Sequence, residues 1–188
     1  MQEVALDETS EQLVVMGLAN ESYGVDIGAV NTIIRMEEVT KIPRAPDFVE
    51  GVINLRGSII PVIDLRKRFG LSVGETTKAT RIVVVEAAGQ MIGMIVDAVV
   101  ETLRLSSDAI EPPSSVVVSV DSQYVRGVGK QDHRLVILLD LDKILTASEV
   151  ESLEKVDKSV DESDEQQKPS EAANSTKESE DEQAARAA

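Results

Sequence analysis

The sequence predicts an all-β protein made of two small, packed β-barrels. Three observations indicate this class: the apolar residues form short runs of Val, Ile and Leu, tight turns rather than long helices separate the runs, and the pattern occurs twice along the chain. Short strands with small turns favour closed barrels, because closure removes exposed sheet edges. A single sandwich of roughly eight to ten strands is the alternative that the pattern leaves open.

The repeat is defined by two constant offsets. At an offset of 69 residues, Leu13–Met16 aligns with Ile82–Val85, and Tyr23–Ile27 aligns with Ile92–Val96. At an offset of 76 residues, Phe48–Val52 aligns with Tyr124–Val128, and Ile63–Leu65 with Leu139–Leu141. We therefore expect one globular region at residues 12–147, with two interlocked barrel subdomains at about 12–77 and 78–147. A barrel of roughly 65 residues is marginally stable by itself, so we expect the two to pack through aliphatic surfaces.

Each copy is expected to contain five strands and one short terminal helix. Strands in the first copy are expected at 12–18, 22–27, 31–36, 51–55 and 58–63, with a helical turn at 28–30 and a short helix from Asp64. Strands in the second copy are expected at 81–86, 90–96, 99–105, 124–129 and 134–139, with a short helix at 140–145. Pro43 and Pro46 make residues 39–46 an extended connection, because proline interrupts helices. The alternation of β-branched runs with Gly-containing turns is typical of hairpins.

The repeat separates residues that the fold requires from residues with another use. Asp64 and Asp140 are equivalent, so both are expected to cap helices, and the equivalent glycines of the two copies are expected to be structural. The tip Asn54-Leu55-Arg56-Gly57 has no counterpart, because the second copy has Lys130–His133 there. Asn54 and Gly57 suit turn chemistry. A guanidinium at a turn tip, by contrast, is available for planar contacts with a partner, so we interpret Arg56 as functional.

Composition and charge exclude several function classes. The net charge of −15 argues against nucleic-acid binding, which needs clustered Lys and Arg. The chain has no cysteine and its only histidine is His133, so a transition-metal site and a cofactor are not expected. The N-terminus lacks the features of a signal peptide, and no apolar run approaches the roughly 20 residues that span a bilayer. We expect a cytoplasmic protein without direct membrane insertion and without enzymatic activity; a hydrolase using His133 is a remote alternative.

The C-terminal segment differs from the rest of the chain. Residues 149–188 contain 13 Asp or Glu and 5 Lys or Arg, and no aromatic residue. The last apolar residues with helical spacing are Val150, Leu153 and Val156. Residues 157–188 cannot bury enough apolar surface to offset their ordering entropy. We predict a disordered acidic tail at 157–188.

Several motifs in the same order resemble those of the CheW family, the chemotaxis coupling proteins. The most specific are Gly51-Val-Ile-Asn-Leu-Arg-Gly57 and Pro61-Val-Ile-Asp-Leu-Arg66. The segments Gly93–Asp97, Tyr124–Gly129 and Leu135–Leu141 extend the similarity, which covers about residues 12–145. The resemblance implies two SH3-like five-stranded barrels that share an apolar seam. It also implies a non-enzymatic adaptor joining the cytoplasmic tip of chemoreceptors (methyl-accepting chemotaxis proteins) to the regulatory domain of the histidine kinase CheA.

The resemblance also implies where these partners bind. Receptor contacts are expected in a groove between the barrels, at Ile27, Val30, Ile33, Gly51, Asn54, Arg56 and Val99. The spacing of Ile27, Val30 and Ile33 suits an apolar patch for an amphipathic helix; the alternative is that these residues, Ile27 above all, belong to the core. Kinase contacts are expected on the second barrel near Ile92 and Met94. Recruitment to membrane-bound receptor arrays follows from the same resemblance; a related adaptor of a pilus-motility or biofilm pathway is the alternative.

Overall fold

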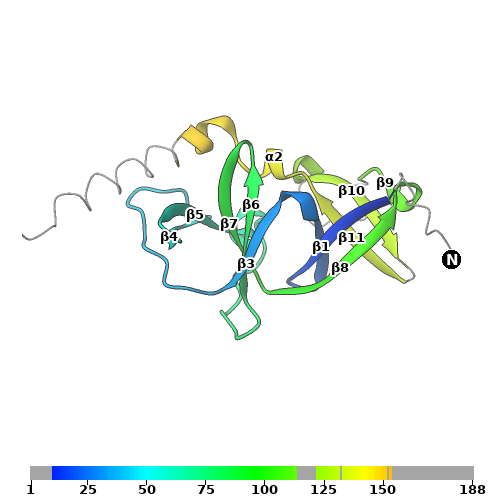
Figure 1. Cartoon of the computed structure of the whole chain (residues 1–188), viewed down its shortest axis with the longest axis horizontal. Coiled ribbons are helices and arrows are strands. Elements are labelled where there is room, and N and C mark those ends of the chain that lie inside the picture. Colours follow the sequence, from blue (N-terminus) through cyan, green and yellow to red (C-terminus); the bar gives the residue numbers. More distant parts are fainter. Residues whose placement is uncertain (1–9, 114–121, 132, 152, 154–188) are drawn as a thin grey trace, which may run out of the picture.

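The structure, a computed structural model, describes residues 10–113, 122–131, 133–151 and 153. Within those ranges it contains eleven strands and five short helices, whose bounds follow; Figure 1 shows how they are arranged. The first part of the chain forms β1 (Ser10–Leu18), β2 (Glu21–Asp26), η1 (Ile27–Ala29), β3 (Val30–Arg35), β4 (Val49–Leu55), β5 (Ser58–Asp64) and α1 (Leu65–Arg68). The second part forms β6 (Arg81–Ala87), β7 (Gln90–Val96), β8 (Ala98–Ser106), η2 (Ser107–Ala109), β9 (Ile110–Glu111), η3 (Ser122–Tyr124), β10 (Val125–Gln131), β11 (Arg134–Leu139) and α2 (Leu141–Ile144). All ten predicted strands are present, and the two-residue strand β9 was not predicted.

The strands form two curved sheets, which confirms the all-β class with two packed barrels. One sheet has the order β8-β1-β2-β11-β10-β9, and the other has the order β3-β6-β7-β5-β4. Neighbouring strands are antiparallel, except that β2 pairs with β11, and β7 with β5, in parallel. Figure 1 shows the two barrels side by side along the long axis of the molecule.

The two copies of the repeat exchange strands. Strands β1 and β2 of the first copy pair with β8 and β11 of the second, while β6 and β7 of the second pair with β3 and β5 of the first. Each barrel therefore combines the first two strands of one copy with the last three of the other. The boundary predicted near residue 77 is consequently wrong as a division between barrels: one sheet is built from residues 30–96, and the other from 10–26 and 98–139.

Equivalent glycines make the parallel junctions possible. Gly24 pairs with Leu138 in one barrel, and Gly93 pairs with Val62 in the other. A Cβ on Gly24 would lie 3.1 Å from side-chain atoms of Leu138 and Val136, and a Cβ on Gly93 would lie 2.8 Å from Ile82. The structural interpretation of this glycine pair agrees with the geometry, because a larger residue would push the paired strands apart.

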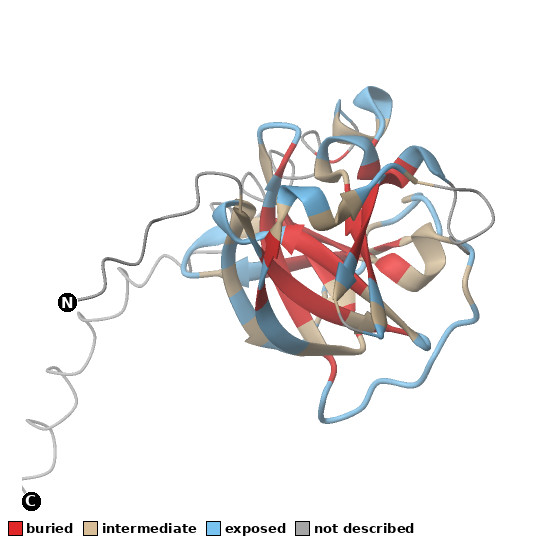
Figure 2. Ribbon diagram, turned by 90° about the vertical axis from the view of Figure 1, so that its right-hand side faces the viewer, coloured by how far each residue is buried: buried red, intermediate tan, exposed pale blue. Residues whose placement is uncertain are grey.

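The largest apolar cluster lies between the barrels rather than inside either one. We call this cluster the seam; it contains 21 buried residues, compared with 6 and 5 buried residues in the clusters assigned to the two barrel interiors. Strands β1 and β6 contribute to both environments: Leu13 and Val15 face one barrel interior, whereas Val14 and Met16 face the seam. Burial on both faces explains the continuous apolar runs in these strands. Figure 2 shows the buried residues concentrated in the strands at the centre of the molecule.

All four aromatic residues of the chain gather around the end of α1. Phe69 contacts Tyr23 and Tyr124, with ring centroids 5.8 and 5.5 Å away. The guanidinium of Arg68 lies over Phe48 at 4.4 Å and over Tyr124 at 5.1 Å from the ring centroids. Phe48 and Tyr124 are equivalent in the repeat, so one cation joins matching positions of the two copies.

Arg68 also anchors the C-terminal helix, which begins after α2 at residue 147. Its Nε donates to the carbonyl of Ile144 at 2.7 Å, and its two terminal nitrogens donate to Glu149 at 3.0 and 3.1 Å. The helix starts with a reciprocal capping box: Thr146 N donates to Glu149 Oε2, and Glu149 N donates to Thr146 Oγ1. Burial raises the pKa of Glu149, but the amide and hydroxyl of Thr146, together with Arg68, lower that pKa by more.

The other local predictions have mixed outcomes. The Asp64 side chain caps α1 by accepting from the amides of Arg66 and Lys67, as predicted. Asp140 precedes α2 but makes no capping hydrogen bond; its carboxylate instead pairs with Lys143 at 2.8 Å. The helical turn predicted at 28–30 lies one residue earlier, at Ile27–Ala29. The tail predicted at 157–188 lies outside the described residues.

Because both barrels depend on the seam, we predict that separation of the barrels and unfolding of their strands occur in a single transition. Tyr23 and Tyr124 both lie in the seam and are the only tyrosines of a chain without tryptophan, so near-ultraviolet circular dichroism reports on the seam. We expect the near- and far-ultraviolet signals to have coincident urea transitions, as in two-state unfolding. A near-ultraviolet transition at clearly lower urea would show that the barrels separate while their strands persist.

Candidate partner-binding surface

The β4–β5 hairpin tip holds Arg56 in a fixed, exposed position. Arg56 and Gly57 form a two-residue turn with φ of 56° and 90°, and the flanking Leu55 and Ser58 are paired. Positive φ at both central positions is the type I′ geometry, which matches the twist of a hairpin. The Asn54 side-chain oxygen accepts from the Gly57 amide at 2.9 Å, so Asn54 stabilises the turn. Arg56 is exposed and makes no ion pair with the residues that the structure describes.

A hollow of about 710 Å³ lies beside this tip. Its apolar lining comes from Leu55, Ile59, Ile60, Pro61, Met91 and Leu153. Its polar lining comes from Asn31, Arg56, Ser58 and Gln90. Strands β3, β4, β5 and β7 and the C-terminal helix therefore meet here. The combination of an apolar surface with a guanidinium that no described residue pairs suits a partner that presents apolar side chains and a carboxylate.

The outward face of β3 continues from the hollow. Exposed and half-buried residues alternate along β3, so that Asn31, Ile33 and Arg35 lie on its exposed face. Ile33 is 40% exposed. Residues two apart on one strand face are about 6.5 Å from each other, which places Ile33 next to Asn31 of the hollow. The structure thus brings two predicted receptor-binding residues, Ile33 and Arg56, to neighbouring parts of one surface.

Three more predicted receptor-binding residues lie at or near the edge of the seam. Val30 and Val99 are equivalent in the repeat, and both are half-buried against the seam cluster. Ile27 belongs to η1, where the Asp26 side chain accepts from the Gly28 amide at 2.6 Å. Ile27 is 37% exposed, so the alternative that it is a core residue is wrong. Val30 and Asn31 are consecutive in β3, and this strand connects the seam edge to the hollow.

Gly51 has a structural role instead of an exposed one. It is buried, has φ of 147°, and a Cβ on it would lie 2.0 Å from the carbonyl oxygen of Thr40. The backbone of Thr40 pairs with Val52 in an isolated bridge, with hydrogen bonds of 2.9 and 2.8 Å. Gly51 therefore lets the 36–48 connection close on β4, and because it is buried it offers little surface to a partner.

The residues predicted near the kinase-binding surface are buried. Ile92 and Met94 are both 0% exposed and belong to the seam cluster. They cannot contact a second protein, because both faces of β7 are covered: one by the seam and one by the barrel interior. The half-buried residues of this strand are Gln90, Met91 and Ile95. Of these, Gln90 and Met91 line the hollow.

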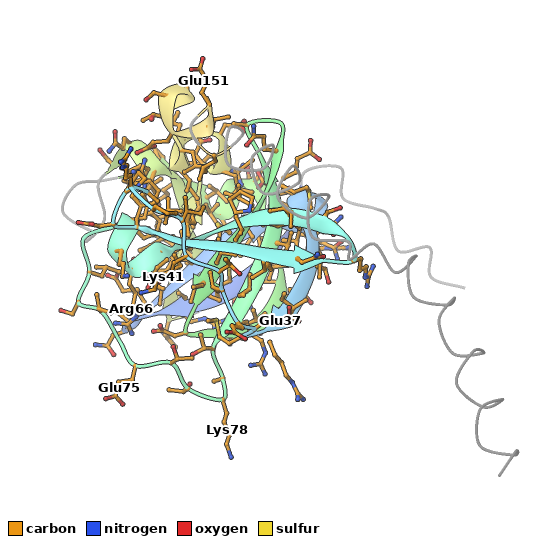
Figure 3. The ribbon with its side chains drawn as sticks, turned by 90° about the vertical axis from the view of Figure 1, so that its left-hand side faces the viewer. Glu37, Lys41, Arg66, Glu75, Lys78 and Glu151 are labelled. Atoms are coloured by element: carbon orange, nitrogen blue, oxygen red, sulfur yellow. The ribbon has the colours of Figure 1, made fainter. Side chains whose placement is uncertain are left out.

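An ion-pair network fixes the start of β8, which carries Val99. Arg66 donates from Nε and one terminal nitrogen to Asp97, at 2.7 and 2.5 Å, and from its other terminal nitrogen to the carbonyl of Ser72 at 2.6 Å. The Ala19 amide also donates to Asp97, at 2.8 Å. The Arg66 hydrogen bonds lower the pKa of Asp97, burial opposes this, and the Ala19 amide lowers the pKa further. Arg66 lies against the body of the protein, whereas Glu75 and Lys78 of the loop before β6 point outward (Figure 3).

His133 lies exposed in the β10–β11 turn. Among the described residues, no group of three or more His, Cys, Asp or Glu is placed to hold a metal ion. His133 makes no side-chain hydrogen bond with any residue that the structure describes, so no partner there orients it as a base. The hydrolase alternative gains no support from this geometry.

Sequence reasoning missed most of the hollow. Asn31, Ile59, Met91 and Leu153 line it and were not predicted as site residues. Leu153 had a recognisable signal, because Thr146-Ala-Ser-Glu149 has the spacing of a capping box and starts the helix that carries it. The strand residues had none, since their proximity depends on the exchange of strands between the copies.

Comparison with known proteins identifies the family. The CheW-like domain model matches residues 12–149. The chain belongs to the CheW-like domain family. The chain is 34% identical to the chemotaxis protein CheW of Klebsiella aerogenes, over 83% of this chain and 94% of that protein. It is 32% identical to the chemotaxis protein CheW of Treponema pallidum, over 80% and 91% of the two chains.

A solved structure agrees with this assignment. The crystal structure of the scaffolding protein TtCheW from Thermoanaerobacter tengcongensis matches with a TM-score of 0.70 and 43% identity, over 74% of this chain and 94% of that one. The CheW-like family and its chemotaxis relatives assign the chain to chemotaxis, as a coupling scaffold. In the part of the chain that the structure describes, no helix has the length and apolar character to cross a bilayer.

Alanine substitutions can distinguish Gly51, which lies against the backbone of Thr40, from Gly57, which lies in an open turn. Both residues have positive φ, but a Cβ on Gly57 meets nothing within 4 Å. We expect Gly57→Ala to lower the free energy of unfolding by about 1 kcal/mol, the cost of the left-handed backbone. We expect Gly51→Ala to lower it by roughly 3 kcal/mol or more, because its Cβ meets backbone. Equal losses in urea denaturation would contradict the close approach to Thr40.

The lowered pKa of Asp97 predicts that the free energy of unfolding decreases at acid pH. Its pKa is lowered below 3.8 in the folded state, so its stabilisation is complete above the unfolded-state pKa and is lost as the pH falls through the folded-state pKa. We expect the urea midpoint to fall as the pH decreases from about 5 to 2. The fall should be smaller in Asp97→Asn, and not abolished, because Glu11 and Glu149 also have lowered pKa values. An identical fall in both proteins would show that Asp97 contributes nothing.

Proposed function

We propose that the chain couples the cytoplasmic tip of a chemoreceptor to the regulatory domain of the histidine kinase CheA, and that it binds the two through separate surfaces. In this role the protein makes and breaks no covalent bond. It raises the local concentration of each partner around the other, so modest individual affinities suffice when many copies assemble. It works on the cytoplasmic face of membrane-bound receptor arrays. The motifs at the hairpin tip and the chemotaxis relatives support this proposal.

The receptor surface that we propose runs from the seam edge to the hairpin tip. It includes Ile27, Val30 and Val99 at the seam edge, and Ile33 and Arg56 around the hollow. Its apolar residues suit one face of an amphipathic helix, and the Arg56 guanidinium suits a carboxylate on the rim of that face. Asn54 acts through the turn that presents Arg56. The observation that carries the proposal is an exposed Arg56, without an ion pair among the described residues, beside a hollow with a largely apolar lining.

A related adaptor role in pilus motility or biofilm signalling would use the same fold and a similar surface. No feature of the described residues favours that pathway, and the relatives reported above are chemotaxis proteins. We therefore propose the chemotaxis pathway, with the kinase bound at a surface distinct from the hairpin tip.

Charge reversal at the tip tests the receptor surface. We expect Arg56→Glu to weaken receptor binding by about tenfold or more, as for an interface anchor, and to leave kinase binding unchanged. Arg104→Glu is the matched control, because Arg104 is also exposed and without an ion pair among the described residues. Affinities for immobilised receptor fragment and kinase regulatory domain give the measurement, and thermal melting checks the fold. Wild-type receptor affinity in a folded Arg56→Glu protein would remove Arg56 from the site.

A further inference from the structure

The last described residue of the C-terminal helix, Leu153, lies at the hollow beside the hairpin tip. Leu153 lines the hollow and is 5% exposed. The helix that carries Leu153 is fixed by the Thr146 capping box and by the ion pair between Arg68 and Glu149. Glu151 points away from the protein (Figure 3), whereas Leu153, on the same helix, is part of the seam cluster and also lines the hollow. The residues that follow Leu153 therefore start at the wall of this cavity.

The sequence after Leu153 matches the chemistry of the hollow. Val156 and Val160 follow Leu153 at intervals of three and four residues, which is the spacing of one helical face. Glu154, Asp157, Asp161 and Glu162 lie between and just after them. The hollow offers apolar side chains and the Arg56 guanidinium, which has no ion pair among the described residues. The segment thus carries apolar and acidic groups that would complement the lining of the cavity.

We propose that residues 154–162 occupy the hollow in the free protein and compete there with the partner that binds Arg56. The occupancy itself depends only on this chain, whereas the competition rests on the receptor surface proposed above. The acidic segment is then a built-in competitor, and receptor binding includes its displacement.

Because Leu153 itself lines the hollow, even a weak contact between the hollow and the residues after Leu153 is effective. A segment on a short tether has an effective concentration of about 1 mM. An intrinsic dissociation constant of about 1 mM then leaves the hollow occupied half of the time. A competitor at half occupancy weakens partner binding about twofold. The carboxylate contacts with Arg56 are exposed, so the Debye length of about 10 Å at 0.1 M salt, shrinking to 3 Å at 1 M, makes the occupancy sensitive to salt.

The absence of cysteine permits a direct test on the full chain. A nitroxide on Ser159→Cys should reduce the amide signals of Asn31 and Gly57 in the spectrum of the ¹⁵N-labelled protein. It should leave those of Gln131 and Leu135, at the equivalent tip of the other barrel, at full height. The reduction should disappear in 1 M salt and in the Arg56→Glu background. Equal signal loss at both tips, or none at either, would overturn the proposal.

Two controls exclude other occupants. A nitroxide on Ser175→Cys, far along the segment, should affect the Asn31 and Gly57 signals less than one on Ser159→Cys. Mixing ¹⁵N-labelled protein without nitroxide with unlabelled protein carrying it should leave both signals unchanged. A reduction that occurs only in the mixture would show that a second copy supplies the occupant, and would overturn the intramolecular proposal.

The competition is tested with matched charge-neutralised variants of the full chain. The proximal variant combines Glu154→Gln, Asp157→Asn, Asp161→Asn and Glu162→Gln. The distal control combines Glu178→Gln, Glu180→Gln, Asp181→Asn and Glu182→Gln. We expect the proximal variant to bind the receptor fragment about twofold more tightly and the distal control to match wild type; equal affinities in all three would overturn the competition. Because the nitroxide experiment needs no receptor, failure of the receptor assignment of Arg56 remains a separate result.

Discussion

The apolar seam between the barrels is the constraint on which the rest of the structure depends. Its cluster holds more buried residues than the two barrel interiors together. Strands β1 and β6 supply side chains to the seam from one face and to a barrel interior from the other, so neither barrel can leave its partner without exposing a strand face. The exchange of strands makes this dependence reciprocal. Two marginal barrels thereby become one cooperative unit.

Arg68 links this seam to the C-terminal helix and therefore to the proposed receptor surface. Its guanidinium lies between Phe48 and Tyr124, from equivalent positions of the two copies, and its hydrogen bonds hold Ile144 and Glu149. Loss of one partner from a largely buried ion pair leaves an uncompensated charge, so this contact favours a single helix position. That position brings Leu153 to the hollow. The shape of the hollow near Arg56 thus depends on a contact in the seam.

Sequence reasoning predicted the features that depend on nearby residues. It missed those that depend on how the two copies of the repeat pair with each other. The predicted strands, the Asp64 cap and the exposed Arg56 follow from turn residues and side-chain spacing near each site. The boundary at residue 77 failed because the equivalent strands β3 and β8 each pair with a strand of the other copy: β1 pairs with β8, and β3 pairs with β6. The same exchange buries Ile92 and Met94, whose strand is covered on both faces. The requirement for Gly51 depends on Thr40, which reaches it through a long connection without regular structure.

The proposed receptor surface lies where the two copies of the repeat differ in sequence. Ile59 and Leu135 occupy matching positions beside the two hairpin tips, yet Ile59 is half-buried in the hollow with Leu153, and Leu135 is 45% exposed. The tip next to Ile59 carries Arg56, whereas Asp132 and His133 replace Arg56 and Gly57 at the other. A strictly symmetric pair of barrels would present one kind of site twice and would recruit two copies of the same partner. Because one tip acquires a guanidinium and a helix while the other does not, a single duplicated fold can offer different surfaces to two different proteins, as coupling requires.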